Sequence, residues 1–184
     1  DPALPRISRD GGGLAYSLAG SGKPPLVLVH GWTCDRTFFA PQFEAFRPRH
    51  RVLAVDLRGH GESDKPEEDY TIGGFADDVA WTAKELGLVK SVFIGHSMGG
   101  LVAQELAACH AGAVSGVVRI DSGPVRRDEA GQRLWDERVA SLSDPQRHME
   151  TRRRMVEGMF EPYDDPARRA SIAETMLGAP RHAA

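Results

Sequence analysis

The alternation of short apolar runs with stretches of helical periodicity limits the fold of this chain more than any other feature. Four runs have strand length and are apolar through most of it: residues 26–30, 51–56, 90–95 and 114–121. Runs of this kind indicate strands buried on both faces, as in a parallel sheet. Helical spacing predicts helices between them, at 38–46, 71–87 and 98–110. The sequence therefore predicts an α/β fold with a mostly parallel sheet and flanking helices.

The two ends of the chain differ in character. Residues 5–20 read as two short strands joined by the glycine turn DGGG, which completes six strands. After residue 124 we find helix-compatible stretches separated by proline-containing breaks, and no further strand. We therefore expect a core over residues 1–124 and a helical cap over residues 125–184. The helix at 98–110 is apolar nearly all round, so we expect it to pack inside the molecule.

Composition excludes several classes of partner. A net charge of -3 and a pI near 6.2 give no electrostatic reason to expect nucleic acid or an anionic membrane. The arginines at 126–127 and 152–154 lie among acidic residues, and we interpret them as solvated helix faces. No apolar run approaches the roughly 18 residues that span a membrane.

The two cysteines, Cys34 and Cys109, lack metal-type spacing and cannot form a disulfide framework. They favour a reducing compartment, so we expect a cytoplasmic protein. Cys34 is interpreted as a small buried apolar residue. Nothing in the sequence implies a metal ion or a cofactor.

Ser97 stands in the pattern Gly-x-Ser-x-Gly, which is weak evidence by itself. A strand-like run precedes it and a helix-like run follows it, so a tight turn would lift its hydroxyl above the sheet edge. Side chains at Gly95 and Gly99 would collide with the neighbouring strand and helix. The N-terminus of the following helix would favour a negative charge beside Ser97. This context predicts a nucleophile rather than a packing loop.

Three motifs then carry a resemblance: HGW at 30–32, DLRGHGESD at 56–64 and GHSMGG at 95–100. Together they make the chain similar to the α/β-hydrolase superfamily over roughly residues 5–125, and most similar to its esterase, lactonase and perhydrolase branch. The resemblance implies that Ser97 is the nucleophile and that the backbone N–H groups of Trp32 and Met98 form the oxyanion hole. The residues it assigns to supporting these motifs are His30, Gly31, Gly95 and Gly99.

Other residues of the motifs have less direct roles. At the turn, the side chain of His96 should point away from the serine hydroxyl. His60 is interpreted as a residue that stabilises its own loop. By the resemblance, serine at 97 argues against dehalogenase and epoxide hydrolase chemistry, because those enzymes of the fold carry aspartate there.

The partners of Ser97 are harder to assign. In this fold the nucleophile is followed along the chain by an acid and then by a histidine. Asp121 ends a predicted strand and is a candidate acid, whereas His148 and His182 follow no strand. We expect residues 125–184 to begin a cap, with the last strands and their acid and histidine absent from the chain. The alternatives are a complete triad with His148 or His182, or a second chain or copy that completes the sheet.

The sequence thus predicts a serine hydrolase of small carboxylic esters or lactones that works through an acyl-enzyme. A perhydrolase or a C–C bond hydrolase on the same serine is one alternative. A catalytically incomplete ligand-binding protein on the same scaffold is another.

Overall fold

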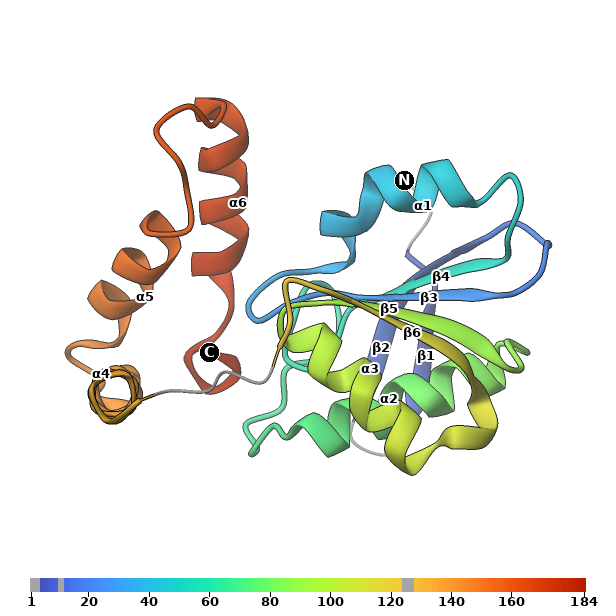
Figure 1. Ribbon diagram of the computed structural model, residues 1–184, viewed down its shortest axis with the longest axis horizontal. Coiled ribbons are helices and arrows are strands. Elements are labelled where there is room, and N and C mark those ends of the chain that lie inside the picture. The colour runs from blue at the N-terminus through green and yellow to red at the C-terminus, as the bar shows by residue number, and fades with distance from the viewer. Residues whose placement is uncertain (1–3, 10–11, 124–127) are drawn as a thin grey trace.

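The structure is a computed structural model and describes residues 4–9, 12–123 and 128–184. Six strands form one sheet in the order β1-β2-β4-β3-β5-β6 (Figure 1). Their bounds are Arg6–Arg9 for β1, Gly12–Ala19 for β2, Leu26–Val29 for β3, Val52–Val55 for β4, Ser91–His96 for β5 and Val114–Ile120 for β6. Strands β4, β3, β5 and β6 are mutually parallel, while β1 and β2 run antiparallel at one edge. The predicted mostly parallel α/β sheet is confirmed.

The register brings the functional loops to one place. Val29, at the end of β3, is opposite Val55 of β4 on one side and Gly95 of β5 on the other. The segments that follow these strands therefore leave the sheet at the same edge, as carboxyl ends of neighbouring parallel strands must. All three sequence motifs begin there.

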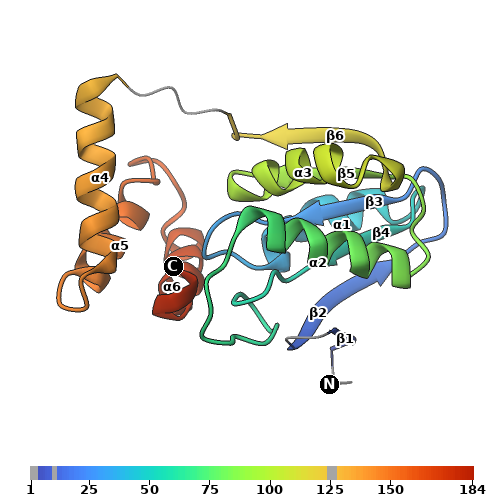
Figure 2. The same ribbon diagram turned by 90° about the horizontal axis from the view of Figure 1, so that it is seen from below.

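Helices cover both faces of the sheet (Figures 1 and 2). On one face lie the short helix η1 (Arg36–Phe39) and α1 (Ala40–Phe46), and on the other lie α2 (Ile72–Glu85), α3 (Met98–Cys109) and the turn η2 (Ala111–Ala113). The larger apolar cluster, on the α2 and α3 face, is centred on buried residues such as Val27, Phe93 and Leu106. Burying both faces explains why β3 and β4 read as unbroken apolar runs.

Local signals in the sequence account for the helix ends. The Thr71 hydroxyl accepts a hydrogen bond from the Gly74 N–H at 3.0 Å and caps the start of α2. Gly87 has a φ of +72°, which stops the same helix in the way the sequence predicted. Pro41 sits in the first turn of α1, where its missing N–H costs nothing.

Beyond residue 127 the chain is helical: α4 (Glu129–Ser143), α5 (His148–Glu157), α6 (Pro166–Gly178) and the short η3 (Arg181–Ala183). This part, here called the helical region, stands beside the sheet (Figure 2). It contacts the rest of the chain, here called the core region, through a small apolar cluster. Cys34 and Phe38 of the core region pack there with Val156 and Met176, so the interpretation of Cys34 as a buried apolar residue is confirmed.

Three predictions about burial were wrong. Helix α3 is not enclosed: Leu101 and the alanines and cysteine at 107–109 are exposed, since only one face of α3 meets the sheet and α2. Strand β6 is not buried on both faces, because in the described chain it pairs only with β5, which leaves Val118 and Ile120 more than 40% exposed. Arg152 is not solvated but fully buried, with its guanidinium donating to the carbonyl oxygens of Met176 and Ala179.

Some predictions fall outside the described residues. They concern the first half of the glycine turn at 10–11, the arginines at 126–127 and the boundary at 124–125.

Candidate active site

Ser97 occupies a strained turn between β5 and α3. Its φ of 52° and ψ of -117° are far from the values that a serine ordinarily adopts. Two hydrogen bonds hold the turn: the Ser97 N–H donates to the carbonyl oxygen of Ile120 at 3.0 Å, and the Gly100 N–H donates to the carbonyl oxygen of Ser97 at 3.0 Å. The strand-turn-helix setting expected for this serine is therefore present.

The glycines on either side of Ser97 allow the close packing of this turn. A Cβ atom on Gly95 would lie 2.0 Å from the carbonyl oxygen of Gly99. One on Gly99 would lie 2.1 Å from the carbonyl oxygen of Val29, at the end of β3. Both distances are far inside van der Waals contact with backbone, which cannot move aside cheaply. The packing reason predicted for these two glycines is confirmed.

The loop after β3 approaches Ser97 closely. A Cβ atom on Gly31 would lie 3.3 Å from the Cβ of Ser97 and 3.1 Å from Nδ1 of His96. Among the described residues, nothing accepts a hydrogen bond from the Trp32 N–H. Met98 is the first residue of α3, so its N–H has no partner within the helix. The two N–H groups that the resemblance assigned to an oxyanion hole are thus available beside the serine.

His30 connects this loop to the loop that follows β4. Its Nε2 accepts a hydrogen bond from the Leu57 N–H at 3.0 Å, and its Nδ1 donates to the carbonyl oxygen of Gly31 at 2.8 Å. The ring is buried, and burial lowers the pKa of His30 to about 4. Both nitrogens of this neutral imidazole form hydrogen bonds. The ring therefore holds the two loops together and does not act as a proton carrier.

Asp56 provides a second connection. Its side chain is buried, pairs with the guanidinium of Arg36, and accepts hydrogen bonds from the N–H groups of Arg36 at 2.7 Å and Glu62 at 2.8 Å. These contacts link η1 to the loop at 56–64. A Cβ on Gly61 would lie 2.3 Å from this carboxylate, so the loop needs glycine there. A buried charge with three donors is held in place strongly.

His60 lies in the same loop, with its ring centroid 5.2 Å from that of His30. Its Nδ1 donates to the carbonyl oxygen of Arg58 at 2.9 Å. Burial is the main cause that lowers the pKa of His60 to about 4. The ring therefore stabilises its own loop in neutral form, as the sequence suggested.

Ser97 opens into a cavity of about 570 Å³, here called the serine cavity. The core region contributes Trp32, Ser97, Met98, Leu101, Asp121 and Ser122 to its walls. The helical region contributes Trp135, Arg138, Val139, Leu142, Met155 and Met159. Most of these side chains are apolar, so the cavity suits a small ligand with a largely apolar body.

The structure separates the candidate partners of Ser97. Asp121 lines the serine cavity and directly follows Ile120, whose carbonyl oxygen bonds to Ser97. His148 lies within the helical region, where its Nδ1 donates to the carbonyl oxygen of Leu142 at 2.6 Å. His182 has its Nε2 3.1 Å from the carbonyl oxygen of Lys65. Neither histidine lines the serine cavity, so the arrangement does not assemble a triad from these residues.

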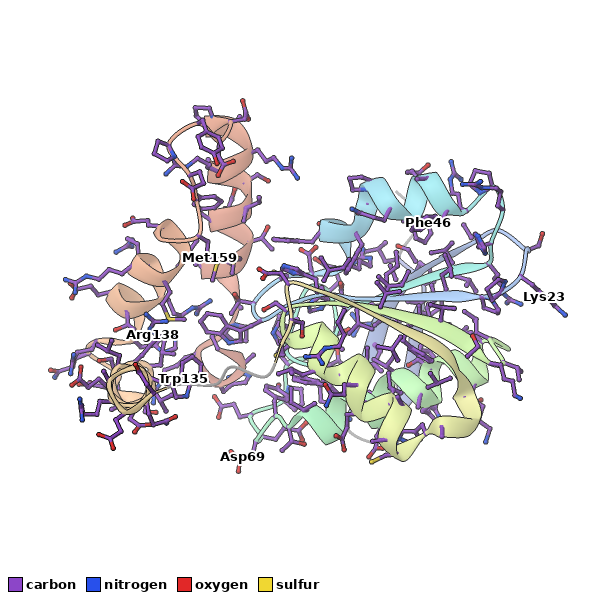
Figure 3. The ribbon with its side chains drawn as sticks, viewed as in Figure 1. Lys23, Phe46, Asp69, Trp135, Arg138 and Met159 are labelled. Carbon is purple, nitrogen blue, oxygen red and sulfur yellow. The ribbon has the colours of Figure 1, made fainter. Side chains whose placement is uncertain are left out.

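Sequence reasoning missed the helical wall of the cavity. Four residues of this wall recur at three- and four-residue spacing on α4, which places them on one helix face: Trp135, Arg138, Val139 and Leu142. Figure 3 labels Trp135 and Arg138. That spacing was visible in the sequence. It could not be interpreted, because nothing in the sequence indicated which face of α4 meets Ser97.

In the described part of the chain, no cluster of three or more His, Cys, Asp or Glu side chains could hold a metal ion. None of its helices has both the length and the apolar character required to cross a membrane.

Comparison with known proteins places these features in a family. Residues 24–149 match the sequence model of a family described as alpha/beta hydrolase fold. The chain is 37% identical over 127 residues to 2-(acetamidomethylene)succinate hydrolase of Mesorhizobium japonicum, across 67% of this chain and 46% of that protein. It is 38% identical over 108 residues to epoxide hydrolase 4 of Mus musculus, across 57% of this chain and 30% of that protein.

Solved structures also resemble this chain. Est816, described as an N-acyl homoserine lactone degrading enzyme, superposes with a TM-score of 0.84 at 27% identity, over 97% of this chain and 69% of that one. The enol-lactonase from Burkholderia xenovorans LB400 gives a TM-score of 0.82 at 27% identity, over 97% and 70%. The chain thus spans less than half the length of these curated relatives and about 70% of these solved structures.

Proposed function

The chain belongs to the α/β-hydrolase fold family, and from that premise we propose that it hydrolyses carboxylic esters or lactones through an acyl-enzyme on Ser97. The observation that carries the proposal is the strained turn at Ser97, which opens into an apolar cavity beside two available N–H groups. Backbone strain of this kind persists where the surrounding structure fixes it, and it is frequent at catalytic residues.

The chemistry follows from these positions. The Ser97 hydroxyl oxygen attacks the acyl carbon while a base takes its proton, and the N–H groups of Trp32 and Met98 donate to the oxyanion. The alcohol oxygen leaves with a proton, and a water molecule then releases the acid and restores the serine. The base has no candidate among the described residues that line the cavity, and Asp121 is a candidate acid. That a further segment or a second chain supplies the base stays a prediction.

The substrate class rests on the cavity and on the relatives. Est816 and the enol-lactonase are described as acting on lactones, and a thermophilic esterase from Thermogutta terrifontis superposes with a TM-score of 0.80 at 28% identity. The serine cavity, with largely apolar walls and a volume of about 570 Å³, suits the acyl part of a small ester or lactone.

We also propose a division of labour between the two parts of the chain. The core region, expected over residues 1–124, holds the nucleophile, while residues 125–184 act as a cap over it. The contribution of α4 and α5 to the cavity walls supports this division.

Three alternatives use the same site. Perhydrolysis and C–C bond hydrolysis would employ Ser97 with a different acceptor or substrate, and a binding protein would keep the cavity without turnover. Epoxide hydrolysis, suggested by the name of one relative, is disfavoured because a serine stands where that chemistry employs aspartate. Dependence of product formation on hydrogen peroxide would distinguish perhydrolysis from ester hydrolysis.

The test uses the protein as its gene encodes it. A fluorophosphonate probe should label the wild-type protein and not Ser97→Ala, which should also lose at least about a thousandfold in turnover of p-nitrophenyl acetate. Ser115→Ala is the matched control, since Ser115 is an exposed serine outside the cavity, and it should keep both activities. Labelling of Ser97→Ala would overturn the proposal, and ligand binding by a wild-type protein that resists the probe would favour the binding protein.

A further inference from the structure

The charged side chains of the serine cavity come from different parts of the chain. Asp121 belongs to the core region and follows Ile120, the residue bonded to Ser97. Arg138 belongs to α4 in the helical region and is the basic side chain among the residues that line the cavity (Figure 3). The cavity therefore combines an acidic group near the nucleophile with a basic group on its helical wall.

Arg138 lacks the partners that two other arginines of the helical region have. Arg154 pairs with Glu150, and buried Arg152 donates to two carbonyl oxygens at the end of α6. Within the described part of the chain, Arg138 has neither an ion pair nor a hydrogen bond. The guanidinium is a planar cation, and at this position it lies beside the apolar wall of the serine cavity.

Within the serine cavity the neighbours of Arg138 are largely apolar, and this makes its charge selective there. Trp135 precedes it by three residues and Leu142 follows it by four, and both line the cavity. A ligand that fills this space covers apolar surface and meets one planar cation, which matches the fork of a carboxylate. Arg138 is itself exposed, so its guanidinium is accessible to an incoming ligand.

We propose that Arg138 binds a carboxylate of the substrate, so that the preferred esters or lactones of this protein carry a second, anionic group on an apolar acyl chain. The catalytic part of this statement rests on the proposed function, whereas the binding part does not. Asp121 disfavours an anionic group beside Ser97, so the charge pair also orients the substrate. The neutral carbonyl lies at the serine and the carboxylate lies at α4.

Binding tests the inference without turnover. In the Ser97→Ala protein, hexanoate and 1-hexanol can be titrated while tryptophan fluorescence is followed, since Trp32 and Trp135 both line the cavity. Adding Arg138→Ala should weaken hexanoate binding about tenfold and leave 1-hexanol binding unchanged. Arg138→Lys should restore part of the loss. Arg133→Ala, an exposed arginine of α4 outside the cavity, is the matched control and should have no effect.

Kinetics tests the same inference on the intact enzyme. Arg138→Ala should lower kcat/KM for mono-p-nitrophenyl glutarate about tenfold and leave p-nitrophenyl pentanoate, its neutral analogue in chain length, unchanged. Equal losses with both esters, no loss with either, or the same loss in Arg133→Ala would overturn the inference. If wild-type protein hydrolyses neither ester while the hexanoate preference depends on Arg138, the proposed function fails and the inference stands.

Discussion

The core region and the helical region are built on different principles. In the core region, β3 and β4 are buried along their whole length and join an apolar cluster shared by the sheet, α2 and α3. In the helical region, the 15-residue helix α4 buries only Ser141 among its residues. Burial of apolar surface is the main stabilising contribution to folding, so we expect the core region to supply most of the stability.

This difference bears on function. Ser97 and the loops around it are fixed by backbone hydrogen bonds, by His30 and by the Asp56–Arg36 pair, all within the core region. The helical region adds side chains to the cavity from a helix that packs loosely. The residues around Ser97 lie on a rigid scaffold, whereas the other cavity walls lie on a weakly packed helix. Substitutions in one set can therefore leave the other set unchanged.

The largest effect should come from breaking the close contact at Gly99. In Gly99→Ala, the new Cβ would lie 2.1 Å from the carbonyl oxygen of Val29 and 2.5 Å from that of His30. Because both neighbours are backbone atoms at the end of β3, we expect a loss of more than about 4 kcal/mol in the free energy of unfolding, or failure to fold. Urea unfolding followed by circular dichroism measures it.

Gly112→Ala provides the control for this comparison. A Cβ there meets nothing within 4 Å, so its stability should stay within about 1 kcal/mol of wild type. Wild-type stability in Gly99→Ala would mean that β3 and α3 are further apart in solution than in the structure.

The sequence predicted the core region well because its signals are local and redundant. Apolar runs, the Thr71 and Gly87 helix signals and the glycines around Ser97 each follow from a few neighbouring residues. It failed where burial depends on what packs from outside. Strand β6 has the composition of an inner strand but pairs on one side only in the described chain, and α3 exposes alanines that cost little in water.

The limit of prediction from sequence is clearer in the helical region. Arg152 stands in a run of three arginines, yet one is buried against the end of α6 and its two neighbours are exposed. Charge patterning cannot distinguish these three, since only the contact with α6 separates them. For the same reason Arg138 could not be singled out before the face of α4 toward Ser97 was known.

Acid should weaken the core region through its two buried histidines. His30 and His60 have pKa values of about 4 in the folded protein against 6.5 for a histidine exposed to water in the unfolded chain, because burial disfavours their charged form. Below pH 6.5 the unfolded chain therefore binds more protons than the folded one, and stability falls as pH drops from about 6.5 toward about 4. Each histidine contributes a slope of at most about 1.4 kcal/mol per pH unit.

Urea unfolding at about pH 7, 6 and 5 measures this slope. His60→Asn should reduce it to about half, because one of the two titrating groups is removed. An unchanged slope in that variant would show that His60 binds its proton as readily in the folded protein as in the unfolded one.

The smallest effect should come from the outer face of α4. Leu134 is 65% exposed, so Leu134→Ala should change the free energy of unfolding by less than about 0.5 kcal/mol. Leu106 on α3 is completely buried, and Leu106→Ala should cost about 2–5 kcal/mol by leaving a cavity in the core cluster. Thermal unfolding of the two variants gives the contrast directly. Equal losses would mean that the protein in solution covers the exposed face of α4, and the helical region would then owe its stability to that covering rather than to its contacts with the sheet.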